Sequence, residues 1–519
     1  MSGFRKKKAS SDTGSHVIRP LGLMEGYESV QHLLGLYYSC VVTCRYVTPG
    51  LQITSSNGPS IEDLGVRALA LTILEHPLLQ VGLADEDSKK PSWVQLKSLD
   101  LRKQLEWLTA AEDENDDGTL LGALQAKHTN PFPNQNEQPT WRVVVVKTGS
   151  LGHMDVLFAY NHAMGDGMSG KIFHQTLLKK LNLVSSGQLV GELQDHTLAL
   201  PTIANMTPPM EELLKFPMSP GFLAIEGWKG IRPSFATTKS ASAASWAPVN
   251  YLPREIGVRL VRVEDDALQV ILEKCRQENT TLTGLLHTLI FLSFAARLQP
   301  DRARAFEAGT PFNMRRYLTA PSTSHPGLQP DTTIGNFAAF HTYRCGTKAT
   351  AKIRAELQEA RNNTEKVGVL ERSLWSIAQD FKVQLAEKLA AGPKDNTLGL
   401  LKLVSNWKKY FKDEYKKPRV ISWEVSNLGA FSGQPRSSEA SASNGDAWTM
   451  DRAIFSQSAA VLGPAYLVNP ISVAGKNLML SCIWQKDVVE EAFGVGVTAD
   501  LQRWLDDLGR GSHLRTGEL

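Results

Sequence analysis

Cysteine is scarce in this chain of 519 residues. Only five are present, an odd number, and they are scattered and mostly embedded in apolar segments: Cys40, Cys44, Cys275, Cys345 and Cys482. This distribution argues against the disulfide framework of a small secreted protein and against the closely spaced cysteine pairs of a zinc knuckle. A reducing compartment is the simplest expectation, and we therefore expect a cytoplasmic protein.

The sequence also lacks an excess of charge of either sign. Its 56 Lys and Arg residues face 53 Asp and Glu residues, for a net charge of +3, so no overall field favours nucleic acid. A small or neutral ligand fits this balance better. Metal-binding motifs are missing as well, because neither H-E-x-x-H nor a paired Cys/His ligand set occurs, and we predict that no metal is required.

Long hydrophobic runs are absent too. The most apolar early segment, Leu33–Val47, is interrupted by Arg45 and is too short to span a bilayer. The N-terminus carries the basic run Arg5–Lys8, but no apolar segment follows it directly, as one does in a secretory signal. We expect no transmembrane segment, although weak peripheral contact with an internal membrane through Leu21–Tyr38 stays open.

The length predicts more than one domain, because a chain of this size exceeds a single hydrophobic core. Residues 1–18 are basic, small and polar and are predicted to be disordered. Prolines and a Ser/Ala/Thr-rich stretch mark residues 201–253 as an inter-domain connection. We therefore predict an N-terminal lobe over residues 19–200 and a C-terminal lobe over residues 254–519.

Strand and helix patterns are mixed in both predicted lobes, which indicates an α/β or α+β fold. Alternation with a period of two predicts strands, whereas apolar positions at helical spacing predict helices. In the first lobe the predicted strands cover 36–47, 141–146 and 154–160, and the helices cover 61–75 and 169–183. In the second lobe the predicted strands cover 257–263, 467–473 and 478–484, and the helices cover 265–277 and 283–298.

The segment Asn161–Gly170 follows a predicted strand, opens a predicted helix and has two interpretations. With Gly165, Gly167 and Gly170 it matches G-x-G-x-x-G, the fingerprint of a dinucleotide-binding Rossmann unit. This interpretation predicts an NAD(P)-dependent oxidoreductase. Against it, the helix is followed by Val184–Gly187 and not by the apolar second strand that such a unit requires.

From His162 the same segment has the form H-x-x-x-D-G. A histidine at the end of a strand can expose Nε2 in a cleft while a local carbonyl holds Nδ1, which fixes the tautomer that a base needs. Asp166 is better placed to hold the loop through an ion pair, and Gly167 lets the backbone approach closely. A buried Asp166 needs a cation, and the candidates are Arg45, Arg142 and Arg315.

This motif resembles the active-site signature of the chloramphenicol acetyltransferase-like superfamily, which includes plant BAHD acyltransferases, peptide-synthetase condensation domains and fungal alcohol acetyltransferases. The resemblance covers Arg19 to Leu508, and further pieces match in order: His76-Pro77-Leu78-Leu79, Pro139-Thr140-Trp141-Arg142 and Pro311-Phe312-Asn313-Met314-Arg315. The late Ser426-Asn427-Leu428-Gly429 resembles the alcohol acetyltransferase branch. Two departures disfavour the other branches, because position 161 is Asn and not the second His of condensation domains, and the plant-type Asp-Phe-Gly-Trp-Gly element is absent.

The resemblance implies two similar α/β lobes, with mixed sheets flanked by helices, around a central active-site tunnel. It implies an O-acetyltransferase of fungal secondary metabolism that moves an acetyl group from acetyl-CoA to a hydroxyl of a small metabolite. His162 is then the general base, Ser426 and Asn427 are candidates for stabilising the oxyanion, and no cofactor is permanently bound. We expect a monomer. An amine acceptor on the same scaffold and a non-catalytic protein of the same fold stay as alternatives.

Two further features have less specific interpretations. His287 lies within an apolar helix and is predicted to be a hydrogen-bonded core residue. A basic cluster could receive the phosphates of coenzyme A, but a solvated helix face is the better interpretation. Its members are Lys408, Lys409, Lys412, Lys416, Lys417 and Arg419.

Overall fold

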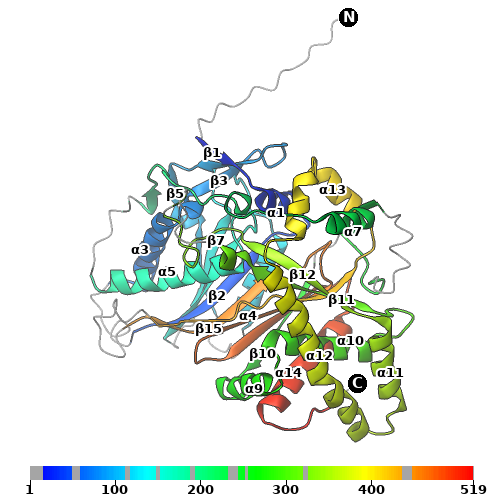
Figure 1. The fold of residues 1–519 in the computed structure, drawn as a ribbon. Helices are drawn as coiled ribbons and strands as arrows, with labels where there is room; N and C mark the ends of the chain where they lie inside the picture. The colour runs from blue at the N-terminus through cyan, green and yellow to red at the C-terminus, as the bar shows by residue number, and fades with distance from the viewer. Residues whose placement is uncertain are drawn as a thin grey trace, which may run out of the picture.

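Two lobes, each built around its own sheet, make up the fold in the computed structural model (Figure 1). The predicted α/β architecture of two lobes with mixed sheets and flanking helices is confirmed. The structure describes residues 16–49, 59–110, 117–147, 152–187, 193, 195–231, 244–251, 255–318, 325, 327–434 and 447–517.

The first lobe is built on a five-stranded sheet with the order β15-β2-β8-β7-β6. Its strands are β2 (Cys40–Val47), β6 (Leu105–Thr109), β7 (Trp141–Lys147), β8 (His153–Tyr160) and β15 (Thr449–Gln457). All neighbours are antiparallel except β6 and β7. Val143 and Val145 of β7 belong to one hydrophobic core cluster, and Val144 and Val146 belong to another. The sheet is thus buried on both faces, which explains why β7 is a continuous apolar run.

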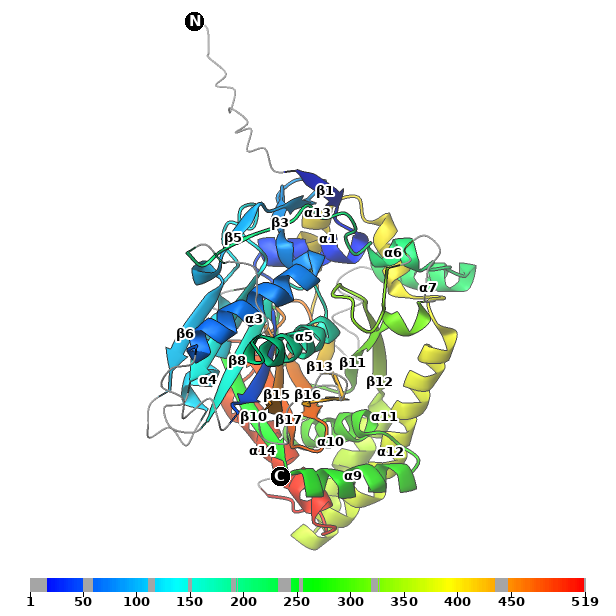
Figure 2. The ribbon, with the colours of Figure 1, turned by 90° about the vertical axis from the view of Figure 1, so that its left-hand side faces the viewer.

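Helices cover both faces of this sheet. α3 (Ile61–Glu75) and α5 (Gly167–Ser185) pack side by side on one face (Figure 2), and α4 (Gly118–Thr129) covers the other. α3 begins after Ser60, whose side chain accepts a hydrogen bond from the Asp63 backbone, and it ends before Pro77. The bounds predicted for this helix are confirmed. α5 follows the end of β8 closely, so this strand-to-helix junction carries the H-x-x-x-D-G motif.

The second lobe holds a seven-stranded mixed sheet with the order β10-β17-β16-β13-β11-β12, with β14 paired to β16. Its strands are β10 (Ile256–Val263), β11 (Phe306–Asn313), β12 (Ala338–Cys345), β13 (Ile421–Val425), β14 (Ala430–Phe431), β16 (Tyr466–Val473) and β17 (Leu478–Gln485). Its helices are α9 (Asp265–Gln277), α10 (Leu282–Arg297), α11 (Thr347–Glu359), α12 (Asn363–Ala391) and α14 (Glu491–Gly509). α10 is apolar over most of its surface because it lies in the core of this lobe.

Smaller elements connect and cover the lobes. The helices are α1 (Leu23–Leu33), α6 (Met210–Leu213), α7 (Pro220–Ile231) and α13 (Trp407–Glu414). The strands are β1 (Val17–Pro20), β3 (Val81–Ala84), β4 (Ser92–Gln95), β5 (Ser98–Asp100) and β9 (Thr197–Ala199). Short 3-10 helices are η1 (Pro77–Gln80), η2 (Leu101–Lys103), η3 (Met314–Tyr317) and η4 (Thr397–Leu403).

The predicted tail of residues 1–18 needs a correction at its end. Val17 and Ile18 belong to β1, which pairs antiparallel with β4, and Ile18 packs against the core of the first lobe. The hydrogen bonds and the buried contact stabilise an ordered strand there. The first 15 residues of the predicted tail lie outside the described part of the chain.

One strand crosses the predicted division between the lobes. β15 lies within the lobe predicted over residues 254–519, yet it pairs antiparallel with β2 in the sheet of the first lobe. The predicted connection over residues 201–253 contains α6 and α7. The boundary between the two lobes therefore differs from the predicted one, because the sheet of the first lobe includes β15 from the C-terminal part of the chain.

The Rossmann interpretation of the glycine pattern is overturned. β8, the strand before Gly165, is antiparallel to both of its neighbours, whereas a Rossmann unit requires a parallel strand at this place. The glycines serve packing instead. A Cβ added at Gly170 would lie 2.3 Å from Val42 Cγ2, and one at Gly165 would lie 2.7 Å from the Ser169 Cβ.

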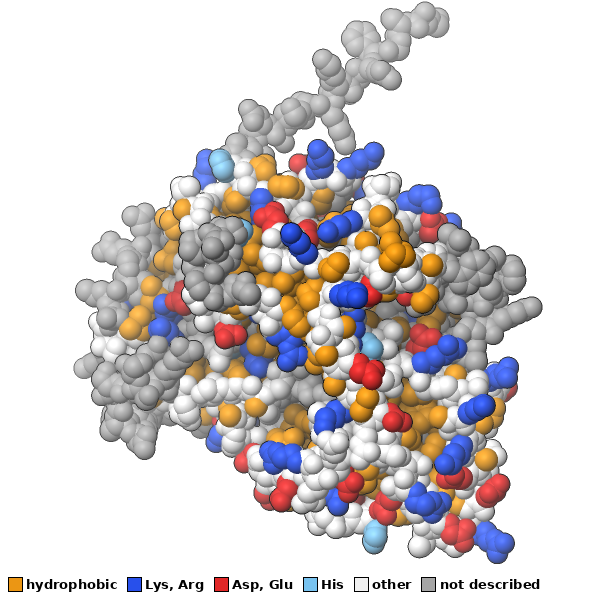
Figure 3. Space-filling model, in the orientation of Figure 1, with side chains coloured by type: hydrophobic (Ala, Val, Ile, Leu, Met, Phe, Trp, Pro, Cys, Tyr) orange, Lys and Arg blue, Asp and Glu red, His pale blue; other side chains and the backbone are white. Residues whose placement is uncertain are grey.

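The surface and the thiols agree with the composition. On the face shown in Figure 3, Lys and Arg side chains are interspersed with Asp and Glu side chains, as expected from the balanced charge. All five cysteines are buried free thiols. Within the described ranges no single helix has the length and hydropathy to cross a membrane, although α9 and α10 together, bent by 94°, satisfy both criteria.

Candidate active site

The turn between β8 and α5 is held by Asn161. Its Oδ1 accepts a hydrogen bond from the Ala163 backbone at 2.9 Å, and its Nδ2 donates to Gln135 Oε1 at 2.9 Å. The Asn161 side chain is buried in these contacts. Asn161, at the position of the second His in the condensation-domain motif, therefore stabilises the turn through buried hydrogen bonds.

His162 is partly exposed and lines a cavity of about 400 Å³ to which both lobes contribute. The predicted residues Ser426 and Asn427 line the same cavity, although they lie far away in the sequence. The fold thus brings together the motif after β8 and the segment after β13. The lining residues are His162, Asp166, Gly167, Met168, Thr283, Thr310, Pro311, Phe312, Asn313, Arg316, Ala338, Leu385, Ser426, Asn427, Leu428, Phe455 and Gln457.

Asn336, from the segment before β12, holds His162 from the other lobe. Its Nδ2 donates to the His162 backbone carbonyl at 2.8 Å and lies 3.1 Å from Nδ1 of the imidazole. The imidazole also interacts with its own backbone carbonyl, which favours a proton on the ring. These contacts hold the ring against the second lobe, and the tautomer of the imidazole decides whether Nδ1 donates or accepts a hydrogen bond.

The surroundings of His162 are acidic. Burial alone would lower the pKa of His162, but Cys40 and the carboxyl group of Glu28 counteract it and raise this pKa well above its ordinary value. Burial raises the pKa of Glu424 to about 7, although a hydrogen bond from Gln457 and the nearby His162 oppose this change. A proton on the imidazole is therefore stabilised by buried carboxyl groups in its neighbourhood.

Asp166 is engaged through both carboxylate oxygens. Oδ1 accepts from the Ser169 backbone at 3.0 Å and from the Ser169 hydroxyl at 3.1 Å. Oδ2 accepts from Arg315 at 2.6 Å and from the Phe337 backbone at 2.9 Å. Burial would raise the pKa of Asp166, but the Arg315 guanidinium and these hydrogen bonds lower it. Asp166 therefore caps α5 and joins the two lobes as a carboxylate.

The three arginines that the sequence offered as partners of Asp166 have different contacts. Arg315 forms the ion pair, and its guanidinium also donates to the Gly335 carbonyl at 2.9 Å. Arg45 pairs with Asp155 on the neighbouring strand β8 at 2.7 Å. Arg142 donates to the Pro139 and Trp141 carbonyls and to Gln138 Oε1. The cation beside Asp166 thus comes from the second lobe.

Gly167 and the segment after β13 pack closely. A Cβ at Gly167 would lie 2.5 Å from Leu428 Cδ2, so the Leu428 side chain would have to shift to make room for a larger residue. Asn427 is fixed, because its Nδ2 donates to Thr283 Oγ1 at 3.1 Å and its Oδ1 accepts from the Gly429 backbone at 2.8 Å. Within the described part of the chain, the Ser426 hydroxyl has no hydrogen-bond partner, and it faces the cavity as a free donor.

The basic cluster around α13 is held by acidic neighbours. Lys409 and Lys416 pair with Asp413, Lys417 pairs with Glu414, and Lys408 contacts Asp87. Arg419 is buried and donates to the carbonyls of Ala247, Ala460, Val461 and Gly463. These contacts fit a solvated helix face and a structural arginine. His287 is buried, with hydrogen bonds to Thr310 and Trp423, and its predicted place in the core is confirmed.

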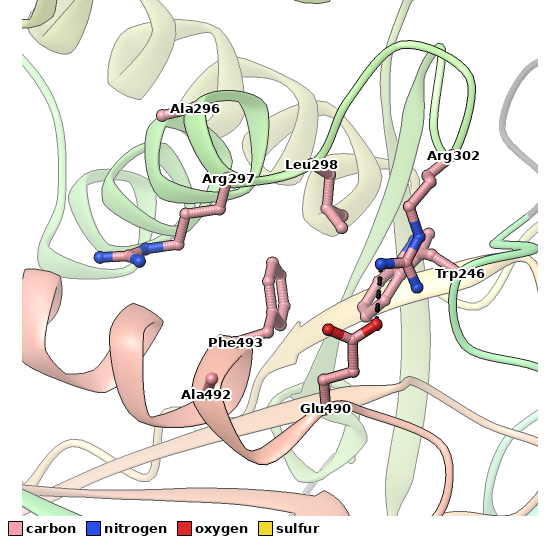
Figure 4. A pocket seen from close by; sticks show the side chains of 8 residues that line it. All are labelled: Trp246, Ala296, Arg297, Leu298, Arg302, Glu490, Ala492 and Phe493. Carbon is pink, nitrogen blue, oxygen red and sulfur yellow. Dashed lines mark hydrogen bonds and ion pairs between the residues drawn. The ribbon is translucent and has the colours of Figure 1, made fainter. Parts of the chain in front are cut away.

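Another cavity, of about 360 Å³, lies between the end of α10 and the start of α14 (Figure 4). Arg302 and Glu490 form an ion pair across it at 2.8 Å, and Arg297 is turned toward the buried Asp500. Its described lining includes none of the candidate site residues from the sequence, whereas the lining of the cavity at His162 includes five of these candidates: His162, Asp166, Gly167, Ser426 and Asn427.

Sequence reasoning missed Asn336, Gln457 and Glu424. Asn336 follows Gly335 in a loop, where an Asn is ordinary turn chemistry and carries no functional signal. Gln457 ends β15, and its amide donates to Glu424 at 2.8 Å and to Asn469 at 2.7 Å. Glu424, the fourth residue of strand β13, lies between Trp423 and Val425, and it was the one usable signal because carboxyl groups are rarely fully buried unless they are paired.

Comparisons with known proteins agree with this geometry. The sequence profile of the alcohol acetyltransferase family matches residues 113–494. The probable alcohol acetyltransferase FCK4 of Fusarium pseudograminearum is 28% identical over 524 residues, which cover 96% of this chain and 98% of FCK4. The N-acetyltransferase SLI1 of Saccharomyces cerevisiae is 20% identical over 402 residues, covering 70% of this chain and 76% of SLI1. Among solved structures, the TRI3 trichothecene 15-O-acetyltransferase from Fusarium sporotrichioides has a TM-score of 0.65 at 14% identity, with 95% of this chain and 96% of that chain covered, which shows a shared fold.

Proposed function

The chain belongs to the alcohol acetyltransferase family of acyltransferases, and from this premise we propose that it transfers an acetyl group from acetyl-CoA to a hydroxyl of a small metabolite. His162 serves as the general base. The observation that carries the proposal is the position of this imidazole, which lines a cavity built by both lobes together with Ser426 and Asn427.

The reaction requires proton transfer in concert with bond formation. An alcohol ionises many units above an imidazole, whose ordinary pKa is about 6.5, so full deprotonation before attack is out of reach. As the hydroxyl oxygen attacks the thioester carbonyl, Nε2 of His162 accepts its proton. The imidazolium then protonates the departing thiolate of coenzyme A, and the ring returns to its neutral form. Such general acid and base catalysis contributes roughly 100- to 10,000-fold.

The tetrahedral intermediate needs a donor for its oxyanion. The Ser426 hydroxyl fits this role, because it reaches the cavity and is not used by another described group. Asn427 stays a second candidate, because its amide carries two N–H groups and donates one of them to Thr283. Glu28 and Glu424 support the mechanism in a different way. Their carboxyl groups favour the imidazolium that forms during attack.

An amine acceptor is the second candidate. The relative SLI1 is named as an N-acetyltransferase, and a neutral amine can attack the same thioester while His162 accepts its proton. The two acceptor classes therefore share the base and the cavity and differ in the nucleophilic atom.

The test is a panel of hydroxylated and aminated metabolites supplied with acetyl-CoA, followed with wild-type protein and with His162→Ala. We expect transfer by the wild type and a loss of roughly 100- to 10,000-fold in the variant. His513→Ala is the matched control, because His513 is exposed and pairs with Glu371 at 3.2 Å. Retained turnover in His162→Ala would eliminate this residue as the base.

A further inference from the structure

Lys171 is a buried cation beside the candidate active site. It lies on α5, five residues after Asp166, and only 6% of it is exposed. Its Nζ donates to the carbonyl of Leu428 at 2.7 Å and to the carbonyl of Ala430 at 3.2 Å, and it lies 5.4 Å from the centre of the Phe431 ring. A lysine of the first lobe therefore binds the backbone of the second.

The bound backbone is the segment that carries Ser426 and Asn427. Its other hydrogen bonds lead into the second lobe, from the Ser426 backbone to Val468 at 2.9 Å and from the Leu428 backbone to Pro470 at 3.0 Å. Toward the first lobe, the Leu428 side chain packs against Gly167. This apolar contact does not fix the orientation of the segment in the way that a hydrogen bond does. Lys171 supplies directional hydrogen bonds from the helix that begins at the catalytic motif.

We propose that Lys171 is a positioning residue for acetyl transfer, whose ammonium group holds the Ser426–Asn427 segment in register with His162. This inference rests on the proposed function, because the position of Ser426 relative to His162 matters only if both residues act on the same thioester. A displacement of the segment by about 1 Å would move the oxyanion donor out of hydrogen-bond reach of the intermediate, and displacements of this size cost about 100-fold in rate.

The protonation state of Lys171 makes the contact dependent on pH. Burial lowers the pKa of Lys171 to about 8, and Cys44 on β2 acts weakly in the opposite direction. Within the described residues, no Asp or Glu side chain forms an ion pair with it. Below pH 8 the ammonium makes charge-assisted hydrogen bonds, which are about twice as strong as those of the neutral amine. The contact therefore weakens as the pH rises through this pKa.

The kinetic test uses Lys171→Met and Lys171→Arg, with Lys180→Met as the matched control. Lys180 lies on the same helix and pairs with Glu75 on α3 at 2.5 Å. At pH 7 we expect Lys171→Met to lower kcat about 10- to 100-fold, with KM for acetyl-CoA changed less than about threefold, while Lys180→Met keeps the wild-type kcat. Above pH 8 the wild-type kcat declines, whereas Lys171→Arg, which stays charged, keeps its kcat.

A measurement that needs no turnover separates this inference from the proposed function. Amide hydrogen exchange of residues 426–431 at pH 7 is expected to be faster in Lys171→Met than in the wild type. In the wild type alone, exchange corrected for its intrinsic pH dependence is expected to accelerate between pH 7 and pH 9. If the wild type acetylates no acceptor, the proposed function fails, and the exchange measurement alone tests whether Lys171 holds the segment of residues 426–431. Unchanged exchange in both comparisons, or a wild-type kcat in Lys171→Met, would overturn the inference.

Discussion

Replacement of Asp166 by Asn tests whether this residue acts through the loop or on the substrate. The change keeps the size of the side chain and an oxygen that can cap α5, but it removes the charge opposite Arg315. That arginine is 3% exposed and Asp166 is 4% exposed, so solvent cannot replace the lost partner. We expect Asp166→Asn to destabilise the protein and to lower activity because His162 and the turn before α5 move.

The magnitude follows from the contacts of Oδ2. This oxygen accepts from the Arg315 guanidinium at 2.6 Å and from the Phe337 backbone at 2.9 Å. An amide nitrogen placed there faces two donors, and an unpaired buried charge costs about 3 to 5 kcal/mol in the free energy of unfolding. Asp166→Asn with Arg315→Met should cost less than the sum of the single changes, because the double variant leaves no buried charge unpaired.

The assay is urea unfolding combined with steady-state kinetics. Asp100→Asn is the control, because it breaks the ion pair with the exposed Arg102 and should change stability far less. The pH dependence gives a second reading. Since the pKa of Asp166 is lowered on folding, its contribution is present above the ordinary Asp pKa of about 3.9 and is lost as the pH falls through the lowered value. Unchanged stability together with lost activity would refute this reasoning and favour a direct role of Asp166 in the reaction.

Four further variants test other contacts of the site. Asn336→Ala removes the amide that holds His162, so kcat should fall about 10- to 100-fold in steady-state assays with KM little changed; an unchanged kcat contradicts this. Because the base acts as neutral imidazole and its pKa is raised, kcat/KM should rise with pH through a midpoint above 6.5, and Glu28→Gln should lower that midpoint in a pH–rate profile. A midpoint that stays in place would exclude Glu28 as a cause. Gly167→Ala should lower kcat through a clash with Leu428, and Leu428→Ala in the same chain should restore it if the clash is the reason.

Local patterns predicted the elements that carry the motif. Apolar spacing and the proline that follows predict the helix over residues 61–75. Both are local signals, because each depends on residues that are close in sequence. The strands before His162 were read from β-branched runs for the same reason. Each of these predictions depends only on residues that are neighbours in sequence, and a single sequence is sufficient to identify them.

Contacts between distant segments could not be read in the same way. The sequence offered three arginines for Asp166, and the choice of Arg315 depends on where the turn after β11 lies relative to α5. Asn336 gave no signal, because its function requires the second lobe to place it against the His162 carbonyl. The resemblance supplied Ser426 and Asn427, but only their neighbours in space show that, among the residues the structure describes, the Asn427 amide has a hydrogen-bond partner and the Ser426 hydroxyl has none.

β15 links the two halves of the site. It pairs with β2 in the first sheet and packs against β16 and β17 of the second. Its last residue, Gln457, accepts a hydrogen bond from Tyr37 at 3.0 Å and donates to Glu424 and Asn469, so one side chain contacts both sides of the cavity. Separating the lobes would break the packing of β15 on β16 and β17 together with the hydrogen bonds of Gln457 to Glu424 and Asn469, and buried polar groups left without a partner are costly. We therefore expect the two lobes to stay packed against each other while substrates bind at His162.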